Sequence, residues 1–106
     1  FGLSRILRSV THLREHFDAD TTLEELAKLS SVSVSGLEKI FKKCYGLSPI
    51  QYRNLLRIDH VKSLLLNGHS IGETAAKVGF SNYFYFCKLF KSKTGTSPSE
   101  YVRLNR

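Results

Sequence analysis

The sequence contains an internal repeat, and this repeat constrains the fold more than any other feature. Ser70-Ile-Gly-Glu73 has the pattern of Thr22-Leu-Glu-Glu25 and follows it by 48 residues. Each is a capping box, which starts a helix because the hydroxyl accepts a bond from a free backbone amide and the glutamate accepts one from the amide of the cap. From the next helix onward the spacing is 49, so we expect one extra residue in the turn near Gly79. The sequence therefore predicts a tandem duplication.

The repeat covers core, capping and helix-ending positions. The later matches pair Ser33, Leu37, Ile40, Phe41, Lys42, Gly46, Ser48, Pro49 and Tyr52 with Asn82, Phe86, Leu89, Phe90, Lys91, Gly95, Ser97, Pro98 and Tyr101. Glycine just after a helix and proline in its first turn are typical of helical segments. The duplicated unit is therefore predicted to be helical.

Local signals predict seven helices and give little sign of strands. Ser4 is predicted to start the first helix, whose apolar stripe is Ile6, Leu7, Val10, Leu13 and Phe17. The third helix is predicted to begin at Ser33 and stop at Gly46, and the fourth to run from Ser48 to Gly68. The predicted fold class is all-α, with two helix-turn-helix subdomains joined by a long linker helix. Its predicted parts are a first lobe over 1–47, the linker helix over 48–68 and a second lobe over 69–106.

Each repeat has the signature of a helix-turn-helix unit. Ala27 and Ala75 are small residues at the place where two helices cross closely. The predicted turns, 30–32 and 79–81, have the short length of such units, and the second contains glycine. Capped helical hairpins also occur in many α folds that bind no DNA. Two copies in one short basic chain nevertheless favour DNA binding.

The charge of the chain favours a polyanionic partner. Sixteen Lys and Arg against nine Asp and Glu give a net charge of +7. Nucleic acid is the first candidate and an acidic membrane the second, although many basic proteins bind neither. The apolar runs are too short to span a bilayer, and the apolar helix faces are accounted for as core, which disfavours a membrane. The basic clusters are Lys39, Lys42 and Lys43, and Lys88, Lys91 and Lys93.

The two helices after the turns are predicted to have one buried and one exposed face. At ~100° per residue, the inward sets are Leu37, Ile40, Phe41 and Cys44 in the first copy and Phe86, Leu89 and Phe90 in the second. The outward sets are Ser35, Lys39 and Lys42, and Phe84, Lys88 and Lys91. Cations suit phosphates and guanine, and apolar groups suit thymine methyls. Phe84 is either a base contact or folds back onto Tyr83 or Tyr85.

The predicted fourth helix is broadly apolar over 49–66, which suits a helix between two lobes. At ~1.5 Å per residue it is about 27 Å long. We expect it to hold two recognition helices at close to one turn of DNA, ~34 Å.

No catalytic or metal-binding pattern is recognisable. The histidines at 12, 16, 60 and 69 are scattered, and Cys44 and Cys87 lack a metal or redox spacing. We expect both cysteines to be small buried side chains in a reducing cytosol. The chain is therefore predicted to be no enzyme and to carry no cofactor or metal.

These motifs resemble the DNA-binding domain of the AraC/XylS family of bacterial transcription regulators over nearly the whole chain. The residues that carry the resemblance in the second unit are Ile71-Gly-Glu-Thr-Ala75, Val78-Gly-Phe80-Ser-Asn82, Phe86, Lys88, Phe90-Lys91, Gly95, Ser97-Pro98 and Tyr101. Those before it are Leu26-Ala27, Ser33, Leu37, Phe41-Lys42, Gly46, Ser48-Pro49, Tyr52 and Arg57. The resemblance implies sequence-specific binding to double-stranded promoter DNA, with recognition helices over 33–45 and 82–94 in successive major grooves.

The resemblance also implies which side chains contact DNA. Base contacts are expected from Ser35, Gly36, Glu38 and Lys39, and from Tyr83, Phe84, Cys87 and Lys88. Further DNA contacts are expected from Ser33, Lys42, Lys43, Asn82 and Lys91. The family often has arginine where Lys39 and Lys88 stand and a small residue where Phe84 stands. These departures bear on the target sequence rather than on the fold.

The resemblance implies a larger protein as well. We expect the chain to be part of a cytoplasmic activator with a sensor or dimerisation domain, and RNA polymerase to be a partner. Related modules are sometimes fused to DNA-repair methyltransferases. The alternative function is therefore a DNA-targeting module of a larger DNA-repair or signalling enzyme.

Overall fold

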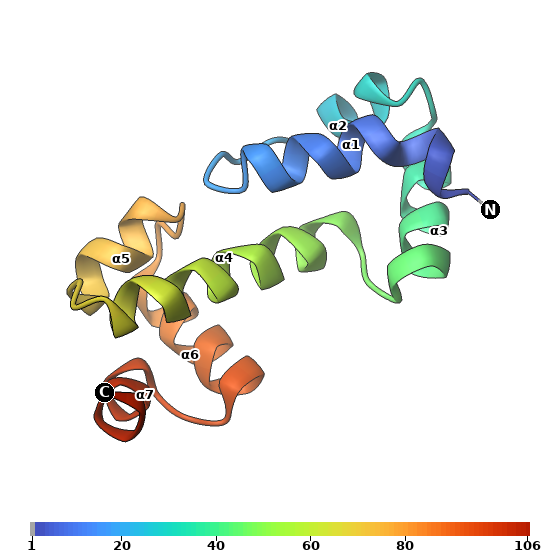
Figure 1. Ribbon diagram of the computed structural model, residues 1–106. Coiled ribbons are helices and arrows are strands. Elements are labelled where there is room, and N and C mark those ends of the chain that lie inside the picture. Colours follow the sequence, from blue (N-terminus) through green and yellow to red (C-terminus); the bar gives the residue numbers. More distant parts are fainter. Residues whose placement is uncertain (1) are drawn as a thin grey trace. The chain divides into compact units, whose positions relative to one another are not determined.

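The computed structural model describes residues 2–106, and this part of the chain contains seven α-helices and no strand (Figure 1). The helices are α1 (Leu3–Glu15), α2 (Leu23–Leu29), α3 (Val34–Tyr45), α4 (Pro49–Leu66), α5 (Ile71–Lys77), α6 (Tyr83–Thr94) and α7 (Pro98–Asn105). The predicted all-α fold with two helix-turn-helix motifs, α2–α3 and α5–α6, is confirmed.

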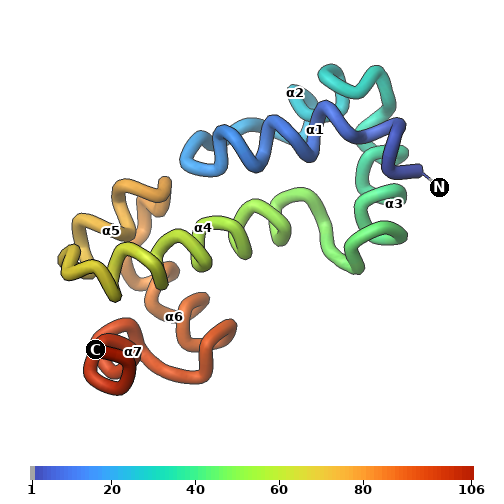
Figure 2. The backbone as a smooth tube through the Cα atoms, in the orientation of Figure 1, coloured from blue at the N-terminus to red at the C-terminus, as the bar shows by residue number. Residues whose placement is uncertain are grey.

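The chain divides into two compact units, residues 1–56 and residues 57–106. The boundary falls inside α4, so the N-terminal part of this helix belongs to the first unit and its C-terminal part to the second. The tube in Figure 2 traces the same order of helix, short helix, turn and longer helix in each unit.

Most helices begin at the predicted capping residues. Thr22 accepts a bond from Glu25 N at 3.1 Å, and Glu25 Oε1 accepts one from Thr22 N at 3.3 Å, which completes the capping box. Ser48 and Gln51 form the same reciprocal pair at 3.1 and 2.9 Å. At Ser70 the structure has only the bond from Glu73 N to the hydroxyl, at 3.3 Å.

The first helix departs from its prediction. It begins at Leu3 after Gly2, which makes no side-chain cap, so Ser4 does not start it. A Cβ added to Gly2 would lie 2.8 Å from Ile40 Cγ2, so a larger residue here would force the Ile40 side chain of α3 to shift. The helix ends at Glu15 before Phe17, and Leu7 is 53% exposed rather than part of the core. The end of α4 at Leu66 is two residues before the predicted Gly68.

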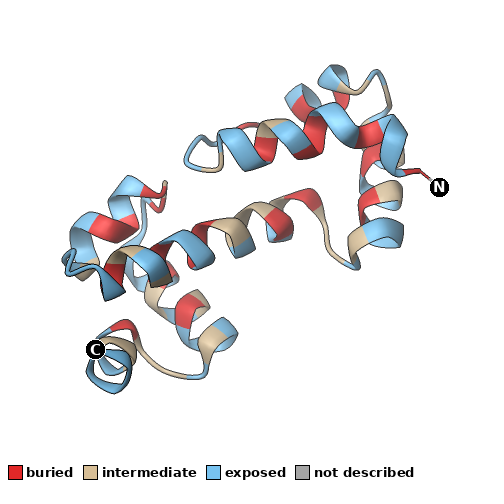
Figure 3. Ribbon diagram, viewed as in Figure 1, coloured by how far each residue is buried: buried red, intermediate tan, exposed pale blue. Residues whose placement is uncertain are grey.

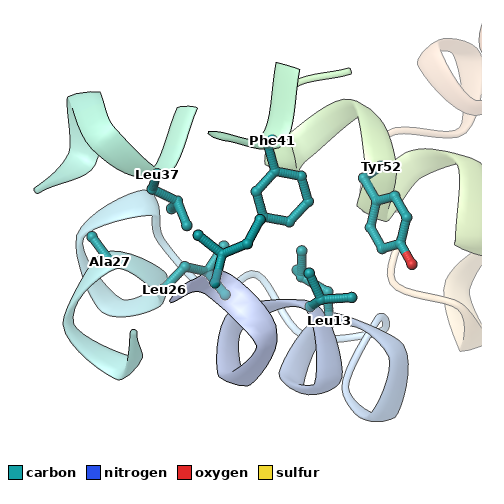
Figure 4. Packing of buried hydrophobic residues seen from close by; sticks show 8 residues of the cluster. Leu13, Leu26, Ala27, Leu37, Phe41 and Tyr52 are labelled. Atoms are coloured by element: carbon teal, nitrogen blue, oxygen red, sulfur yellow. The ribbon is translucent and has the colours of Figure 1, made fainter. Parts of the chain in front are cut away.

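The first unit packs α1, α2 and α3 around one apolar core. Figure 4 shows side chains from these three helices and from the start of α4 turned into a common interior. The buried members of this core are Ile6, Val10, Leu13, Leu26, Ala27, Leu37, Phe41 and Tyr52. The ring of Phe41 contacts that of Tyr52 edge-on, with centroids 5.7 Å apart. This packing fixes the face of α3 that points outward.

The second unit has a core of the same kind, richer in aromatic rings. Its fully or nearly buried apolar residues are Ile58, Val61, Leu65, Ala75, Val78, Phe80, Phe86 and Phe90. The rings of Phe80 and Phe86 lie 5.2 Å apart, and Tyr101 of α7 meets Phe90 edge-on at 5.4 Å. In both units the buried positions lie where helices pack together and the exposed ones on the outer faces (Figure 3).

The two turns have the same backbone bonds, which locates the extra residue of the second repeat. Val32 N donates to Ala27 O and Phe80 N to Ala75 O, both at 3.0 Å. Ser31 and Gly79 occupy the same place in the two turns and both have positive φ, 54° and 108°. The 48-residue spacing therefore holds through Phe80, and the extra residue is Ser81, just before α6.

The repeat also extends into the helix that precedes each motif. Val10 and Leu13 of α1 match Ile58 and Val61 of α4 at a spacing of 48, and all four are buried. At the same spacing, buried Ser9 matches buried Arg57. Each side chain bonds to the helix-turn-helix motif of the same unit. Ser9 Oγ donates to Leu26 O at 2.6 Å, and Arg57 Nη1 donates to Gly79 O at 3.2 Å. The helix before the motif is thus part of the duplicated unit.

Candidate nucleic-acid interface

Helix α3 exposes the outward side chains that its periodicity predicts. Leu37 and Phe41 are buried, whereas the side chains of Ser35, Glu38 and Lys39 are exposed. Exposed Lys42 and Lys43 extend this face toward the helix end, and Gly36 is half-buried. The Lys42 ammonium donates to Gly46 O at 3.2 Å and keeps further donors for a phosphate.

One member of the predicted inward face of α3 is misplaced. Cys44 is exposed, and Ile40 is only half-buried. Both residues lie at the edge of the face that packs on α1. The helical periodicity of ~100° per residue gives the direction of each side chain, but it does not show how much of this face α1 covers. The expectation that Cys44 is a buried apolar residue is wrong.

Helix α6 presents the equivalent face with larger side chains. Phe84 is 84% exposed, and Lys88 and Lys91 are exposed four and seven residues later, on the same side of the helix. Cys87 is half-buried between them. The sequence left two possibilities for Phe84, a base contact or a side chain folded back onto a neighbouring tyrosine. The side chain is exposed, as a base contact requires, and its ring also meets the ring of Tyr83 edge-on, with centroids 6.2 Å apart.

Tyr83 lies on this face with its hydroxyl against Cys87. Hydrogen bonding with the Cys87 side chain, followed by burial, raises the pKa of the Tyr83 hydroxyl above its ordinary value of 10. The phenol is therefore protonated at neutral pH. The position of Cys87 against Tyr83 also accounts for its partial burial.

The N-terminal ends of both helices suit an anion. Neither α3 nor α6 has an acidic residue in its first turn, whereas α2, α5 and α7 do. No carboxylate in the first turn therefore neutralises the partial positive charge at the start of either helix. The caps accept bonds from Gly36 N to Ser33 Oγ at 3.0 Å and from Tyr85 N to Asn82 Oδ1 at 2.9 Å. The hydroxyl hydrogen of Ser33 and the amide hydrogens of Asn82 are still able to donate to phosphate.

The structure adds a basic residue that the sequence did not single out. Arg5 of α1 lines a surface cavity of about 560 Å³ together with Lys39 and Lys43 of α3. The cavity exists because α1 packs on α3 beside Ile40, a contact between residues some 35 positions apart. No local pattern around Arg5 signals this neighbourhood.

The described part of the chain contains neither a metal-ligating cluster nor a membrane-spanning helix. Residues 2–106 hold no group of three or more metal-ligating side chains. None of the helices described has both the length and the apolar character needed to cross a membrane.

Comparison with known proteins agrees with the fold. A family model described as a helix-turn-helix domain matches residues 26–104. The bifunctional transcriptional activator/DNA repair enzyme AdaA of Bacillus subtilis is 31% identical over 96 residues, which are 90% of this chain and 46% of AdaA. The chain thus spans less than half of this relative, and 33% of a second curated relative from the same organism.

Solved structures give the same result. The C-terminal domain of AraT, a response regulator from Geobacillus stearothermophilus, is 32% identical, with a TM-score of 0.86 over 94% of this chain and 84% of that chain. The DNA-binding domain of AdpA, solved in complex with a target DNA, shares the fold at 24% identity, with a TM-score of 0.87 over 94% and 91% of the two chains. The chain therefore belongs to the AraC family, as one of its helix-turn-helix domains that bind specific DNA sequences to regulate transcription.

Proposed function

We propose that one copy of this chain reads two unlike half-sites of promoter DNA, with α3 and α6 in successive major grooves. The observation that carries the proposal is the repeated exposed face. Lys39 and Lys42 recur as Lys88 and Lys91 at a spacing of 49, and all four are exposed. One continuous helix of 18 residues, α4, lies between the two recognition helices in the sequence, so both belong to a single chain.

The proposed roles follow from side-chain chemistry. Lys39 and Lys88 take guanine acceptors or phosphates, and Glu38 takes the amine of cytosine. The hydroxyl oxygen of Tyr83 accepts a hydrogen bond, because its single O–H already donates to Cys87. The remaining base-facing positions are Ser35, Gly36, Phe84 and Cys87, and the phosphate-facing ones are Ser33, Lys42, Lys43, Asn82 and Lys91.

The wider role rests on the relatives. AdaA is named as a transcriptional activator, and AraT is named as a response regulator. We propose that this chain works within a larger bacterial activator, beside a sensor or dimerisation domain, and contacts RNA polymerase at promoters in the cytoplasm.

A second candidate function is suggested by the same relatives. AdaA is also named a DNA repair enzyme, and the match covers only part of it. The chain would then direct a repair or signalling domain to DNA. Both candidate functions require the same DNA binding. The kind of domain that is encoded together with this one distinguishes the two candidates.

The salt dependence of binding tests the proposed interface. If about six phosphates are neutralised, the logarithm of the binding constant should fall against the logarithm of salt concentration with a slope near −5. Lys91→Ala should make this slope less steep by about 1. Fluorescence anisotropy with a duplex selected from a random pool measures both.

A lysine outside the proposed interface provides the control. Lys62 of α4 lies 3.6 Å from Asp59, and Lys62→Ala should leave the slope unchanged. A slope near zero, or an equal change for both variants, contradicts the proposed interface.

A further inference from the structure

The two recognition helices differ most in their first turn. Tyr83, Phe84 and Tyr85 begin α6, whereas the matching positions of α3 hold Val34, Ser35 and Gly36. These three aromatic side chains at the start of α6 are all exposed, at 46%, 84% and 50%. Large exposed apolar groups are expected where a partner covers them. The second unit therefore carries an apolar contact surface that the first lacks.

The two tyrosines that flank Phe84 in the sequence contact the core of the second unit. The ring of Tyr83 lies 6.0 Å from that of buried Phe86, and the ring of Tyr85 lies 6.4 Å from that of buried Phe80. Phe84 contacts only Tyr83 among the ring pairs of the described residues. The aromatic ring of Phe84 is thus exposed yet supported, which lowers the entropy lost when it is covered.

The surroundings of Phe84 indicate DNA rather than a protein as the covering partner. Lys88 and Lys91 follow it at i+4 and i+7 on the same exposed face. Residues 57–106 carry eight Lys and Arg against three Asp and Glu. A lysine-rich helix face suits the phosphate-lined major groove, whereas protein interfaces are depleted in lysine.

A phenyl ring can recognise only one feature of a base edge in that groove. It has no donor or acceptor, so it cannot distinguish the polar groups of guanine, adenine or cytosine. The C5 methyl of thymine is the one apolar group that a base pair presents in the major groove. We propose, on the basis of the function above, that Phe84 selects thymine in the half-site bound by α6 by covering its C5 methyl group.

The same chemistry makes the domain sensitive to cytosine methylation. 5-Methylcytosine presents a methyl group at the same place on the pyrimidine ring as thymine. At a position where cytosine replaces the selected thymine, methylation of that cytosine should therefore restore part of the lost affinity. The matching position of α3, Ser35, has no comparable apolar side chain, so the first half-site should not respond in this way.

Removal of single methyl groups from DNA tests the proposal without changing the protein. Each thymine of a selected site is replaced by deoxyuridine, which keeps every hydrogen-bonding group and lacks only the methyl. Footprinting with the Lys88→Ala variant first identifies the half-site of α6, which is the half-site that this variant no longer protects. Deoxyuridine at one or two positions there should weaken binding by about fourfold per methyl. Methylation of a cytosine placed at the same position should strengthen binding by a similar factor.

Variants of Phe84 connect the effect to this side chain. Phe84→Ser should bind the thymine and deoxyuridine duplexes equally, whereas Phe84→Leu, which stays apolar, should retain part of the difference. Leu104→Ser, which changes an exposed apolar side chain of α7 outside the proposed interface, is the control and should respond to deoxyuridine as the unchanged protein does. Thermal melting should be the same for all four proteins because the Phe84 side chain is exposed.

The outcomes separate this proposal from the proposed function. A half-site of α6 without thymine, or one where deoxyuridine has no effect on the unchanged protein, overturns methyl recognition while DNA binding stands. An equal deoxyuridine effect in the unchanged protein and Phe84→Ser also overturns it, because another group then senses the methyl. Failure of the unchanged protein to select any duplex contradicts the proposed function itself.

Discussion

Thr74 of α5 illustrates how a single buried hydroxyl bears on the stability of one unit. The residue is 1% exposed, and its Oγ1 has no hydrogen-bond partner among the described residues. Leu26 holds the matching position of the first unit, 48 residues earlier, and is fully buried. A hydroxyl that leaves water without finding a partner costs free energy that an apolar side chain of the same shape does not. The second unit is therefore not optimised for stability at this point.

Thr74→Val should raise the free energy of unfolding by about 1–2 kcal/mol. The two side chains have nearly the same volume, so the core keeps its packing. Thr94→Val is the matched control, because the Thr94 hydroxyl donates to Phe90 O at 2.8 Å and its loss should lower stability. Urea unfolding followed by circular dichroism measures both, and a destabilised Thr74→Val would show that the hydroxyl has a partner in solution.

At the scale of one element, the start of α6 depends on Arg57 of α4. This buried arginine donates from Nη1 to Gly79 O at 3.2 Å, and its guanidinium lies 5.5 Å from the centre of the Phe80 ring. Both contacts hold the turn that leads into α6. In the first unit, Ser9 has the matching position and binds Leu26 O and the hydroxyl of Ser30. The two units thus secure the same motif with different chemistry.

Arg57→Ala should lower the free energy of unfolding by about 2–4 kcal/mol, since a charged hydrogen bond and a cation–π contact are lost together. Arg57→Lys should recover little, because a lysine does not combine a planar stack with a directed donor. Footprints of Arg57→Ala should weaken at the half-site of α6 first. Ser9→Ala, the counterpart in the first unit, should affect the half-site of α3 instead. Full stability of Arg57→Lys would contradict this role.

The limits of most elements could be predicted because their signals are local. The caps at Thr22, Ser33 and Asn82 lie within three residues of the amides that they satisfy. The start of α1 could not, because Gly2 makes no side-chain cap and lies against Ile40 of another helix.

The same distinction between local signals and packing of distant helices holds for the candidate site. Helical periodicity predicts the exposed lysines of α3 and α6, whereas the grouping of Arg5 with Lys39 depends on how α1 packs on α3. The side chains of Ser9 and Arg57 have no chemistry in common, so their equivalence follows only from the 48-residue spacing that their buried neighbours share.

For the molecule as a whole, we expect that one chain reads two unlike half-sites. The duplication is head to tail through α4, in contrast to a two-fold dimer. The half-sites should therefore resemble a direct repeat, with centres about 10–11 base pairs apart over roughly 20 base pairs. They should differ in sequence, because small side chains begin α3 and aromatic ones begin α6.

Hydroxyl-radical footprinting of the 106-residue chain on a selected duplex tests this claim most directly. We expect a monomer to protect two successive major grooves on one face of the DNA. Lys39→Ala should weaken protection of one groove and Lys88→Ala that of the other. A palindromic site that is protected only by a dimer, with one recognition helix of each chain on the DNA, would contradict the account.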